Sequence, residues 1–323
     1  MLVLGLQGSP RKKGNSNHLM QLFMEQAAAL GARTKVVDAA RRKISPCREI
    51  GVCESDGHCP IKDEMHSEVY GLLREADIVV AATPVFFYNM TAQLKALIDR
   101  CQALWARKYR LKIKDPGAAG RKGFMLSVAA TRGKNLFEAI DLTCRYFFDA
   151  ISAEYTGSLT YRGVEDVGDM AAVETAALDV QLAVTQLMAP LQHRKRVLFV
   201  GRDNALGSQM AAAFARQMAW ERLDVASAGV EVARQVAPQL ESLMAEKGLD
   251  LGFAVTHAFE EMLDVHRPDV VIHLGDEDSS LDLAGIEVRH WSLAFDDPDS
   301  EAEFCALRDR IEMQVATLVD DLA

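Results

Sequence analysis

Apolar residues in the first part of the chain fall into short continuous runs that alternate with helical patterns. The continuous runs predict buried strands, and apolar residues at spacings of three and four predict amphipathic helices. Strands are expected at 2–6, 35–38, 77–83, 123–128 and 154–158, and helices after residue 18 and over about 63–75, 91–104, 134–150 and 169–189. This alternation predicts a doubly wound parallel sheet, which binds ligands in loops at the carboxyl ends of its strands.

The alternation begins again after a polar, basic stretch at 190–196. Strands are expected near 197–200, 224–228, 269–274 and 286–291, and helices near 208–221, 236–247 and 301–322. The 323 residues also exceed what one ordinary core needs. We therefore expect an α/β chain with two doubly wound parallel-sheet domains, residues 1–190 and 196–323.

Charge divides the chain at the same place. Residues 1–190 carry 24 Lys and Arg against 21 Asp and Glu, a net charge of +3, and residues 191–323 carry 12 against 25, a net charge of −13. The acidic second part argues against a nucleic acid partner. No apolar run reaches the roughly 18 residues of a membrane span, and no signal-peptide pattern opens the chain. We expect a cytoplasmic protein with neither nucleic acid nor membrane as a partner.

A polar turn, residues 8–17, separates the first strand from the first helix. Backbone N–H groups and the positive end of a helix dipole meet at such a turn, which makes it an anion site. Side-chain donors are expected from Ser9, Asn15, Ser16 and Asn17, and a guanidinium suited to phosphate oxygens from Arg11. An ordinary capped turn is the alternative, and we favour a bound phosphate.

Two further loops, 84–90 and 129–133, follow later strands. Flavin mononucleotide (FMN) needs this arrangement: an anion cradle for its phosphate, a loop along the ring, and donors facing the pyrimidine edge. Phe86, Phe87 and Tyr88 are candidates to pack on the isoalloxazine ring. The competing expectation places at least one of Phe86 and Phe87 in the core.

The stretches GSPRKKGNS (8–16) and TPVFFYNMTAQLKALIDR (83–100) resemble the NAD(P)H-dependent FMN reductase branch of the flavodoxin-like superfamily. The resemblance implies FMN as cofactor and NAD(P)H as co-substrate. It also implies a homodimer or higher oligomer, in which Trp105 and residues 107–118 contribute to the partner's site. By the same resemblance, the phosphate is held by Ser9, Arg11, Asn15, Ser16 and Asn17, the ring is lined by Pro84, Val85, Phe86, Phe87, Tyr88 and Asn89, and the pyrimidine side is closed by Thr131, Arg132 and Gly133.

Three cysteines, Cys47, Cys53 and Cys59, lie in a polar loop similar to that of iron–sulfur flavoproteins, which hold a [4Fe–4S] cluster with four cysteines. Ile50 stands where the second of those cysteines belongs. Three thiolates leave one iron without a protein ligand, so we assign no metal site and read the thiols as loop-packing groups. A cluster and a Cys53–Cys59 redox pair are the alternatives.

Residues 197–210, VLFVGRDNALGSQM, resemble the opening of low-molecular-weight protein tyrosine phosphatases and related arsenate reductases. The resemblance continues to the end of the chain, through 226–230, His257 and 297–298. In that family a nucleophilic cysteine is followed, after five residues, by an arginine and a serine. Here glycines occupy the first two positions (201 and 207), Leu206 replaces a second loop cysteine, and Asn204, Ser208 and the general-acid candidate Asp297 are retained.

Those two glycines remove the chemistry of the second domain. A thiolate at a helix N-terminus supplies the covalent step, and an arginine clamps the equatorial oxygens. Glycine replaces neither, so we expect no phosphatase or arsenate reductase activity. The roles left open are a scaffold or dimerisation module and a domain that senses a ligand or docks a partner.

The sequence thus predicts an FMN-dependent oxidoreductase that takes hydride from NAD(P)H and reduces a small acceptor: a flavin, a quinone, a nitro compound or a metal ion. The flavin carries the chemistry, so no side chain is assigned as a catalytic acid or base. One alternative is an electron-transfer or redox-sensing flavoprotein whose second domain docks a partner. The other is a binding protein with two inert domains.

Overall fold

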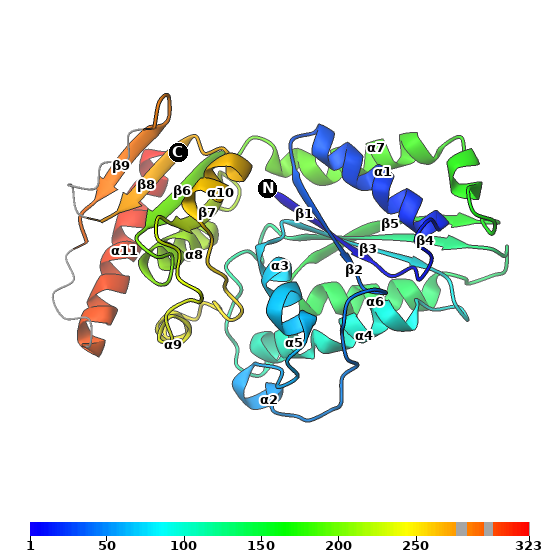
Figure 1. Ribbon diagram of the computed structural model, residues 1–323, viewed down its shortest axis with the longest axis horizontal. Coiled ribbons are helices and arrows are strands. Elements are labelled where there is room, and N and C mark those ends of the chain that lie inside the picture. The colour runs from blue at the N-terminus through cyan, green and yellow to red at the C-terminus, as the bar shows by residue number, and fades with distance from the viewer. Residues whose placement is uncertain (276–282, 294–299, 323) are drawn as a thin grey trace. The chain divides into compact units, whose positions relative to one another are not determined.

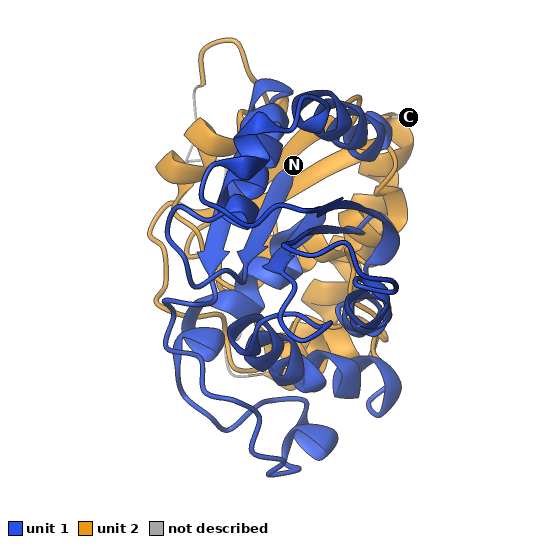
Figure 2. Ribbon diagram, turned by 90° about the vertical axis from the view of Figure 1, so that its right-hand side faces the viewer, with its two compact units in different colours: residues 1–112, 120–190 blue, residues 113–119, 191–323 orange. Residues whose placement is uncertain are grey.

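The computed structural model describes residues 1–275, 283–293 and 300–322. They form two compact units, which Figure 2 distinguishes by colour: unit 1, residues 1–112 and 120–190, and unit 2, residues 113–119 and 191–323. Each unit has one parallel sheet, which confirms the predicted class of two parallel-sheet α/β domains. No helix in the described ranges has both the length and the apolar character needed to cross a bilayer.

The sheet of unit 1 has the strand order β2-β1-β3-β4-β5, with every neighbouring pair parallel. This flavodoxin-like order places the switch point, where such folds bind ligands, between β1 and β3. The three central strands are buried on both faces, which explains their continuous apolar runs. The strands are β1 (Leu2–Gln7), β2 (Arg33–Asp38), β3 (Ile78–Pro84), β4 (Lys122–Ala129) and β5 (Glu154–Arg162).

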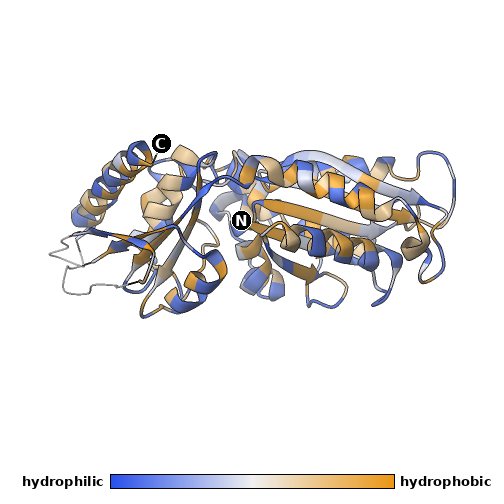
Figure 3. Cartoon of the chain, turned by 90° about the horizontal axis from the view of Figure 1, so that it is seen from above, coloured by the Kyte–Doolittle hydropathy of each residue, from blue (hydrophilic) through white to orange (hydrophobic). Residues whose placement is uncertain are grey.

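Helices cover both faces of this sheet. In Figure 1, α1 and α7 lie together on one side, and α3, α4, α5 and α6 lie on the other. The helices are α1 (Asn15–Ala29), α2 (Cys53–Asp56), α3 (Tyr70–Glu75), α4 (Ala92–Arg100), α5 (Gln102–Tyr109), α6 (Glu138–Ala150) and α7 (Ala176–Met188), with a π-helical turn at Met65–Val69 and 3₁₀ turns at Asp169–Ala172 and Ala189–Leu191. Figure 3 shows the apolar strands enclosed between these layers.

Some predicted elements of unit 1 have different limits. The helix expected at 91–104 is two helices, because the backbone leaves helical geometry at Cys101 (ψ 1°). Its start is fixed by Thr91, whose side chain accepts the N–H of Leu94 as an N-cap. The last strand extends to residue 162 rather than 158, because it continues past a bulge at Gly157, which has a φ of +140°.

The sheet of unit 2 has the order β7-β6-β8-β9 and is also parallel throughout. Its core joins α8, α9 and α11 on one face, while α10 packs on the other face. Helix α10 was not predicted, since it has only eight residues. The elements are β6 (Lys195–Gly201), α8 (Gly207–Ala219), β7 (Leu223–Gly229), α9 (Leu240–Ala245), α10 (Phe259–His266), β8 (Val270–Leu274), β9 (Glu287–Trp291) and α11 (Glu301–Asp321).

Candidate functional site

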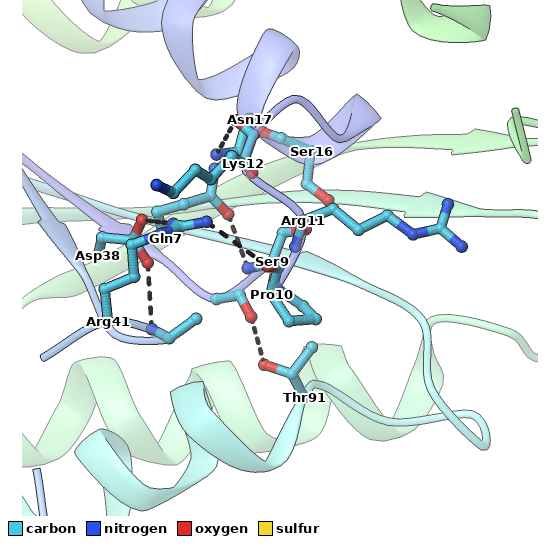
Figure 4. Close-up of polar contacts among 12 residues, drawn as sticks. Gln7, Ser9, Pro10, Arg11, Lys12, Ser16, Asn17, Asp38, Arg41 and Thr91 are labelled. Atoms are coloured by element: carbon cyan, nitrogen blue, oxygen red, sulfur yellow. Dashed lines mark hydrogen bonds and ion pairs between the residues drawn. The ribbon is translucent and has the colours of Figure 1, made fainter. Parts of the chain in front are cut away.

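The loops that follow β1 and β3 are joined at the carboxyl edge of the unit 1 sheet. The N–H of Gly8 donates to the carbonyl of Ala82 at 2.8 Å. The hydroxyl of Thr91 donates to the carbonyl of Gly8 at 2.7 Å (Figure 4). A Cβ at position 8 would lie 2.8 Å from the Cβ of Leu94, so this close approach requires glycine. Thr91 therefore caps α4 and also fixes the opening loop.

A side chain that the sequence analysis overlooked, Gln7, braces the opening loop from within. Its Nε2 donates to the carbonyl of Ser16 at 3.2 Å, and its Oε1 accepts the N–H of Ser9 at 3.0 Å. The hydroxyl of Ser9 in turn accepts the N–H of Arg11 at 3.3 Å. The available signal was a buried glutamine at the end of an otherwise apolar strand.

The N-terminus of α1 has no cap from the protein. Its N-cap residue, Gly14, makes no side-chain cap. Within the part of the chain that the structure describes, the backbone N–H groups of Lys12, Lys13, Asn15 and Ser16 have no acceptor. Unsatisfied N–H groups at the positive end of a 15-residue helix are the elements of an anion site. The loop therefore fits the phosphate group that its sequence predicts.

The predicted phosphate ligands differ in burial and in the hydrogen bonds that their side chains make. Ser9 and Ser16 are buried in the loop, and the side chain of Asn17 donates to the carbonyl of Lys12 at 3.2 Å. The side chain of Asn15 bonds the loop after β5: its amide donates to the carbonyl of Asp166 at 2.8 Å, and its Oδ1 accepts the N–H groups of Gly168 and Met170. Asn15 therefore offers the phosphate its backbone N–H rather than its side chain. Arg11 is exposed and extends away from Ser9 and Asn17 in Figure 4.

The loop after β3 ends in a tight hairpin of aromatic residues. Phe86 and Asn89 exchange backbone hydrogen bonds of 2.8 and 2.9 Å, and between them Phe87 and Tyr88 have φ of +48° and +62°. Two consecutive positive φ values fit a type I′ turn, which favours Asn and Gly. The expectation that Phe86 or Phe87 is a core residue is wrong, because this turn leaves them 48% and 103% exposed. Strained backbone that carries exposed aromatic side chains is typical of a functional loop.

The other predicted ring-lining residues lie nearer the sheet. Pro84 ends β3, and the N–H of Val85 donates to the carbonyl of Val128 at 2.9 Å. The side chain of Val85 packs against the small cluster of Ala129, Leu136 and Phe137. The Oδ1 of Asn89 accepts the N–H of Met90 at 2.8 Å. These residues fix the base of the hairpin.

The loop after β4 meets the aromatic hairpin. A Cβ at Gly133 would lie 2.9 Å from the hydroxyl of Tyr88, so the two loops are in contact. The carbonyl of Gly133 accepts a hydrogen bond from Arg162 at 2.9 Å. Thr131 and Arg132 are exposed beside it. The structure thus brings together all three loops that the sequence assigned to one site.

The hairpin yields a stability prediction. Replacing Phe87 by Asn and Tyr88 by Gly installs the pair that type I′ turns favour. We expect the free energy of unfolding to rise by about 1 kcal/mol, because two strained non-glycine φ values are relieved. Urea unfolding of the double variant and the parent chain measures this. A lower free energy of unfolding would show that aromatic contacts, rather than the turn, stabilise the hairpin.

The loop with Cys47, Cys53 and Cys59 is held by a buried ion pair. The guanidinium of Arg100 contacts both carboxylate oxygens of Asp63, at 2.8 and 3.3 Å, and donates to the carbonyls of Ser45 and Ile61. Cys47 is exposed, Cys53 half-buried and Cys59 buried. Burial, with the neighbouring Cys59 and Cys47, raises the pKa of the Cys53 thiol. No group of three His, Cys, Asp or Glu in the described ranges is arranged to hold a metal.

The Arg100–Asp63 ion pair leads us to expect that the stability of this loop falls at acidic pH. Burial by itself raises the pKa of Asp63, but hydrogen bonds and charge from Arg100 outweigh it and leave that pKa below its usual value. A depressed folded-state pKa contributes stability above the unfolded-state value of about 4, and this stability is lost as the pH falls through the folded-state value. At pH 7, Asp63→Asn is expected to cost about 3 kcal/mol, because it leaves the Arg100 charge buried and unpaired.

Urea unfolding between pH 7 and pH 3 measures this loss. The difference between the parent chain and Asp63→Asn should shrink below about pH 4. Asp99→Asn breaks the exposed Lys95–Asp99 pair of α4 and serves as the matched control, with an expected change within about 0.5 kcal/mol. Equal losses in the two variants would contradict the assigned role.

A surface groove of about 430 Å³ lies between helices of unit 1, and one of the residues singled out in the sequence, Trp105, lines it. Trp105 of α5 lines it together with Leu142 and Tyr146 of α6. None of the three site loops contributes a lining residue among those described. The expected contribution of Trp105 to a partner's site stays a prediction.

The loop after β6 in unit 2 is held by the hydrogen bonds of a buried asparagine. Asn204 is fully buried with a φ of +58°, and its Nδ2 donates to the hydroxyl of Ser208 at 2.9 Å. Its Oδ1 accepts from Nε2 of Gln209 at 3.1 Å and from the N–H of His257 at 2.9 Å. Asp297 lies outside the described residues.

The two glycines of this loop leave room for side chains. A Cβ at Gly201 would lie 3.2 Å from the hydroxyl of Ser208, a contact that a small shift relieves. A Cβ at Gly207 would meet only side-chain atoms of Ile311 and Leu274 at 3.6 Å, an ordinary van der Waals distance. A Cβ is thus tight at position 201 and unhindered at position 207, and the loop carries neither a thiol nor a guanidinium at these positions.

Comparison with known proteins finds a family match for each half of the chain. Residues 1–140 match the family described as NADPH-dependent FMN reductase, and residues 196–323 match the family described as low molecular weight phosphotyrosine protein phosphatase. Both resemblances seen in the sequence are thereby confirmed.

Individual relatives each match less than half of this chain. An iron-sulfur flavoprotein of Methanosarcina thermophila is 37% identical over 132 residues, which are 41% of this chain and 65% of that protein. Arsenate reductase 2 of Staphylococcus saprophyticus is 28% identical over 40% of this chain and 98% of its own length. A solved arsenate reductase from Archaeoglobus fulgidus is 29% identical over 38% of this chain and 98% of its own, with a TM-score of 0.35. The chain spans 45–65% of the length of four iron-sulfur flavoproteins that it matches.

Proposed function

Because residues 1–140 match the family described as NADPH-dependent FMN reductase, we propose that unit 1 binds FMN and transfers electrons from NAD(P)H to a small acceptor such as a flavin, a quinone, a nitro compound or a metal ion. The observation that carries the proposal is the uncapped N-terminus of α1 beside three loops in contact. By itself, an anion site at a helix N-terminus would bind any phosphate-containing ligand. Its position at the switch point, beside exposed aromatic residues, favours a nucleotide with a planar ring.

Different residues of the site would hold the phosphate and the ring of FMN. The free N–H groups of the opening loop, with Ser9 and Ser16, would hold the phosphate, and Gln7 would keep that loop in shape. The hairpin at 86–89 and the loop at 131–133 would line the ring. Bound FMN supplies the hydride and electron chemistry, and the protein supplies orientation and hydrogen bonds. No acid or base is required of the chain's own side chains.

The proposal for unit 2 is a phosphatase-like domain without turnover, because Gly201 and Gly207 offer neither a nucleophile nor a cationic clamp. Its retained loop is proposed to serve as a scaffold or docking element. The expectations of a cytoplasmic location and of a homodimer or higher oligomer remain part of this proposal.

Anaerobic titration of the FMN-loaded protein with NADPH and with NADH tests the reductase function. We expect the flavin absorbance to bleach within the mixing time or over seconds with at least one nucleotide. A bound flavin that resists both nucleotides would overturn the NAD(P)H part. It would then favour electron transfer from a protein donor, a second candidate consistent with the full exposure of Phe87 beside the site.

A further inference from the structure

Two histidines of unit 2 face each other across neighbouring strands. His273 of β8 and His290 of β9 are register partners, and their Nδ1 atoms lie 3.4 Å apart. The rings are nearly perpendicular, at 81°. His273 is only 4% exposed, while His290 is exposed. The proposed function of unit 1 and the degenerate loop of unit 2 use neither residue.

The pair is poorly explained as a simple hydrogen bond. N–H···O hydrogen bonds in proteins are about 2.7–3.2 Å long, and the 3.4 Å between the two nitrogens is longer than that range. Among the residues that the structure describes, no carboxylate or carbonyl hydrogen-bonds to either ring. A nearly buried imidazole with one weak partner costs free energy unless another group satisfies it. A ligand between the two nitrogens would do so.

The spacing of the nitrogens matches a metal chelate. With Zn–N bonds of about 2.0–2.1 Å and a tetrahedral angle, two ligand nitrogens lie about 3.3 Å apart. We propose that His273 and His290 form a two-histidine site for a divalent first-row transition ion such as Zn²⁺, Ni²⁺ or Cu²⁺. The ion is bound through both Nδ1 atoms, and each ring keeps its proton on Nε2.

The surroundings favour this role. Paired parallel strands fix the two backbones, so little freedom is lost when the ion binds. The described residues supply two ligands, and we assign the remaining coordination positions to water. The site is therefore weak and exchangeable rather than a structural four-ligand centre.

Calorimetric titration with Ni²⁺ alone tests the site in the full chain. The triple variant Cys47→Ser, Cys53→Ser and Cys59→Ser serves as the background, so that loop thiols do not compete for the ion. Loss of a group that only supports a metal ligand typically lowers metal affinity by about tenfold or more. Loss of a ligand itself should cost at least as much, so His290→Gln should weaken Ni²⁺ binding by about tenfold or more. His193→Gln, at an exposed linker histidine, is the matched control and should leave the affinity unchanged.

Chemical protection gives a second readout that needs no histidine variant. Ni²⁺ should slow carbethoxylation of His290 by diethyl pyrocarbonate, read by peptide mass spectrometry, and leave His193 unprotected. Equal Ni²⁺ affinity in the two glutamine variants, or modification of His290 at the same rate with and without Ni²⁺, would overturn the site. Either result would leave the pair as an edge-to-face ring contact.

Discussion

Replacing Ser16 by aspartate is expected to weaken FMN binding by about 100-fold, or about 2.7 kcal/mol, without unfolding unit 1. Ser16 is the second residue of α1 and is buried in the opening loop. A carboxylate there repels a phosphate and competes with it for the same N–H groups. The same carboxylate interacts favourably with the positive end of the helix dipole, so the fold should be retained. Fluorescence titration of the apoprotein with FMN measures the change.

A surface serine provides the matched control for this substitution. Ser67 is exposed in the π-helical turn, and Ser67→Asp adds the same charge outside the three loops. Its affinity for FMN should equal that of the parent chain. If Ser16→Asp binds FMN as tightly as Ser67→Asp does, the phosphate does not lie at the N-terminus of α1.

The paired substitution Gly201→Cys with Gly207→Arg is expected to create aryl phosphatase activity at least about 100-fold above the background rate, at which the parent chain should stay. The cysteine would lie at the N-terminus of α8, where the helix favours a thiolate. The arginine would supply the bidentate clamp, and one such electrostatic contact is typically worth about 10²–10³ in rate. A Cβ at position 207 makes only ordinary contacts, a Cβ at position 201 lies 3.2 Å from the Ser208 hydroxyl, and the Asn204–Ser208 bond shapes the loop.

Hydrolysis of an aryl phosphate at pH 6 measures this gain. Each single substitution should stay near background, because the two groups act as a unit. Gly201→Ser with Gly207→Arg is the control, since it retains the clamp and lacks the thiolate. Steady hydrolysis by the parent chain itself would contradict the proposal that unit 2 is inactive.

The sequence predicted the fold well wherever local pattern and burial coincide. The continuous apolar runs of β1, β3 and β4 predict central strands because these strands are buried on both faces. Helix α10 has only eight residues, too few for the 3.6-residue period to be distinguished from a loop. The limits of α4 and β5 depend on a local cap and a bulge, which are weak signals in one sequence.

The candidate site was predicted as three loops, but its side-chain details were not. The side-chain amide of Asn15 donates to Asp166 in the loop after β5. The two residues are 151 positions apart in the sequence, so no local pattern predicts that contact. The exposure of Phe86 and Phe87 depends on a turn type that aromatic residues rarely adopt. The bracing by Gln7 and Thr91 likewise joins groups distant in the chain. Local residue types indicated where the site lies, while tertiary contacts decide which atoms face it.

The central claim is that the opening loop of unit 1 holds the phosphate of FMN. Its most direct test compares binding of FMN and of riboflavin, which has the same ring and no phosphate, to the apoprotein. We predict that FMN binds at least about 100-fold more tightly, because charge-assisted hydrogen bonds to the phosphate are lost with riboflavin. Equal affinities, or no binding of either flavin, would contradict the claim.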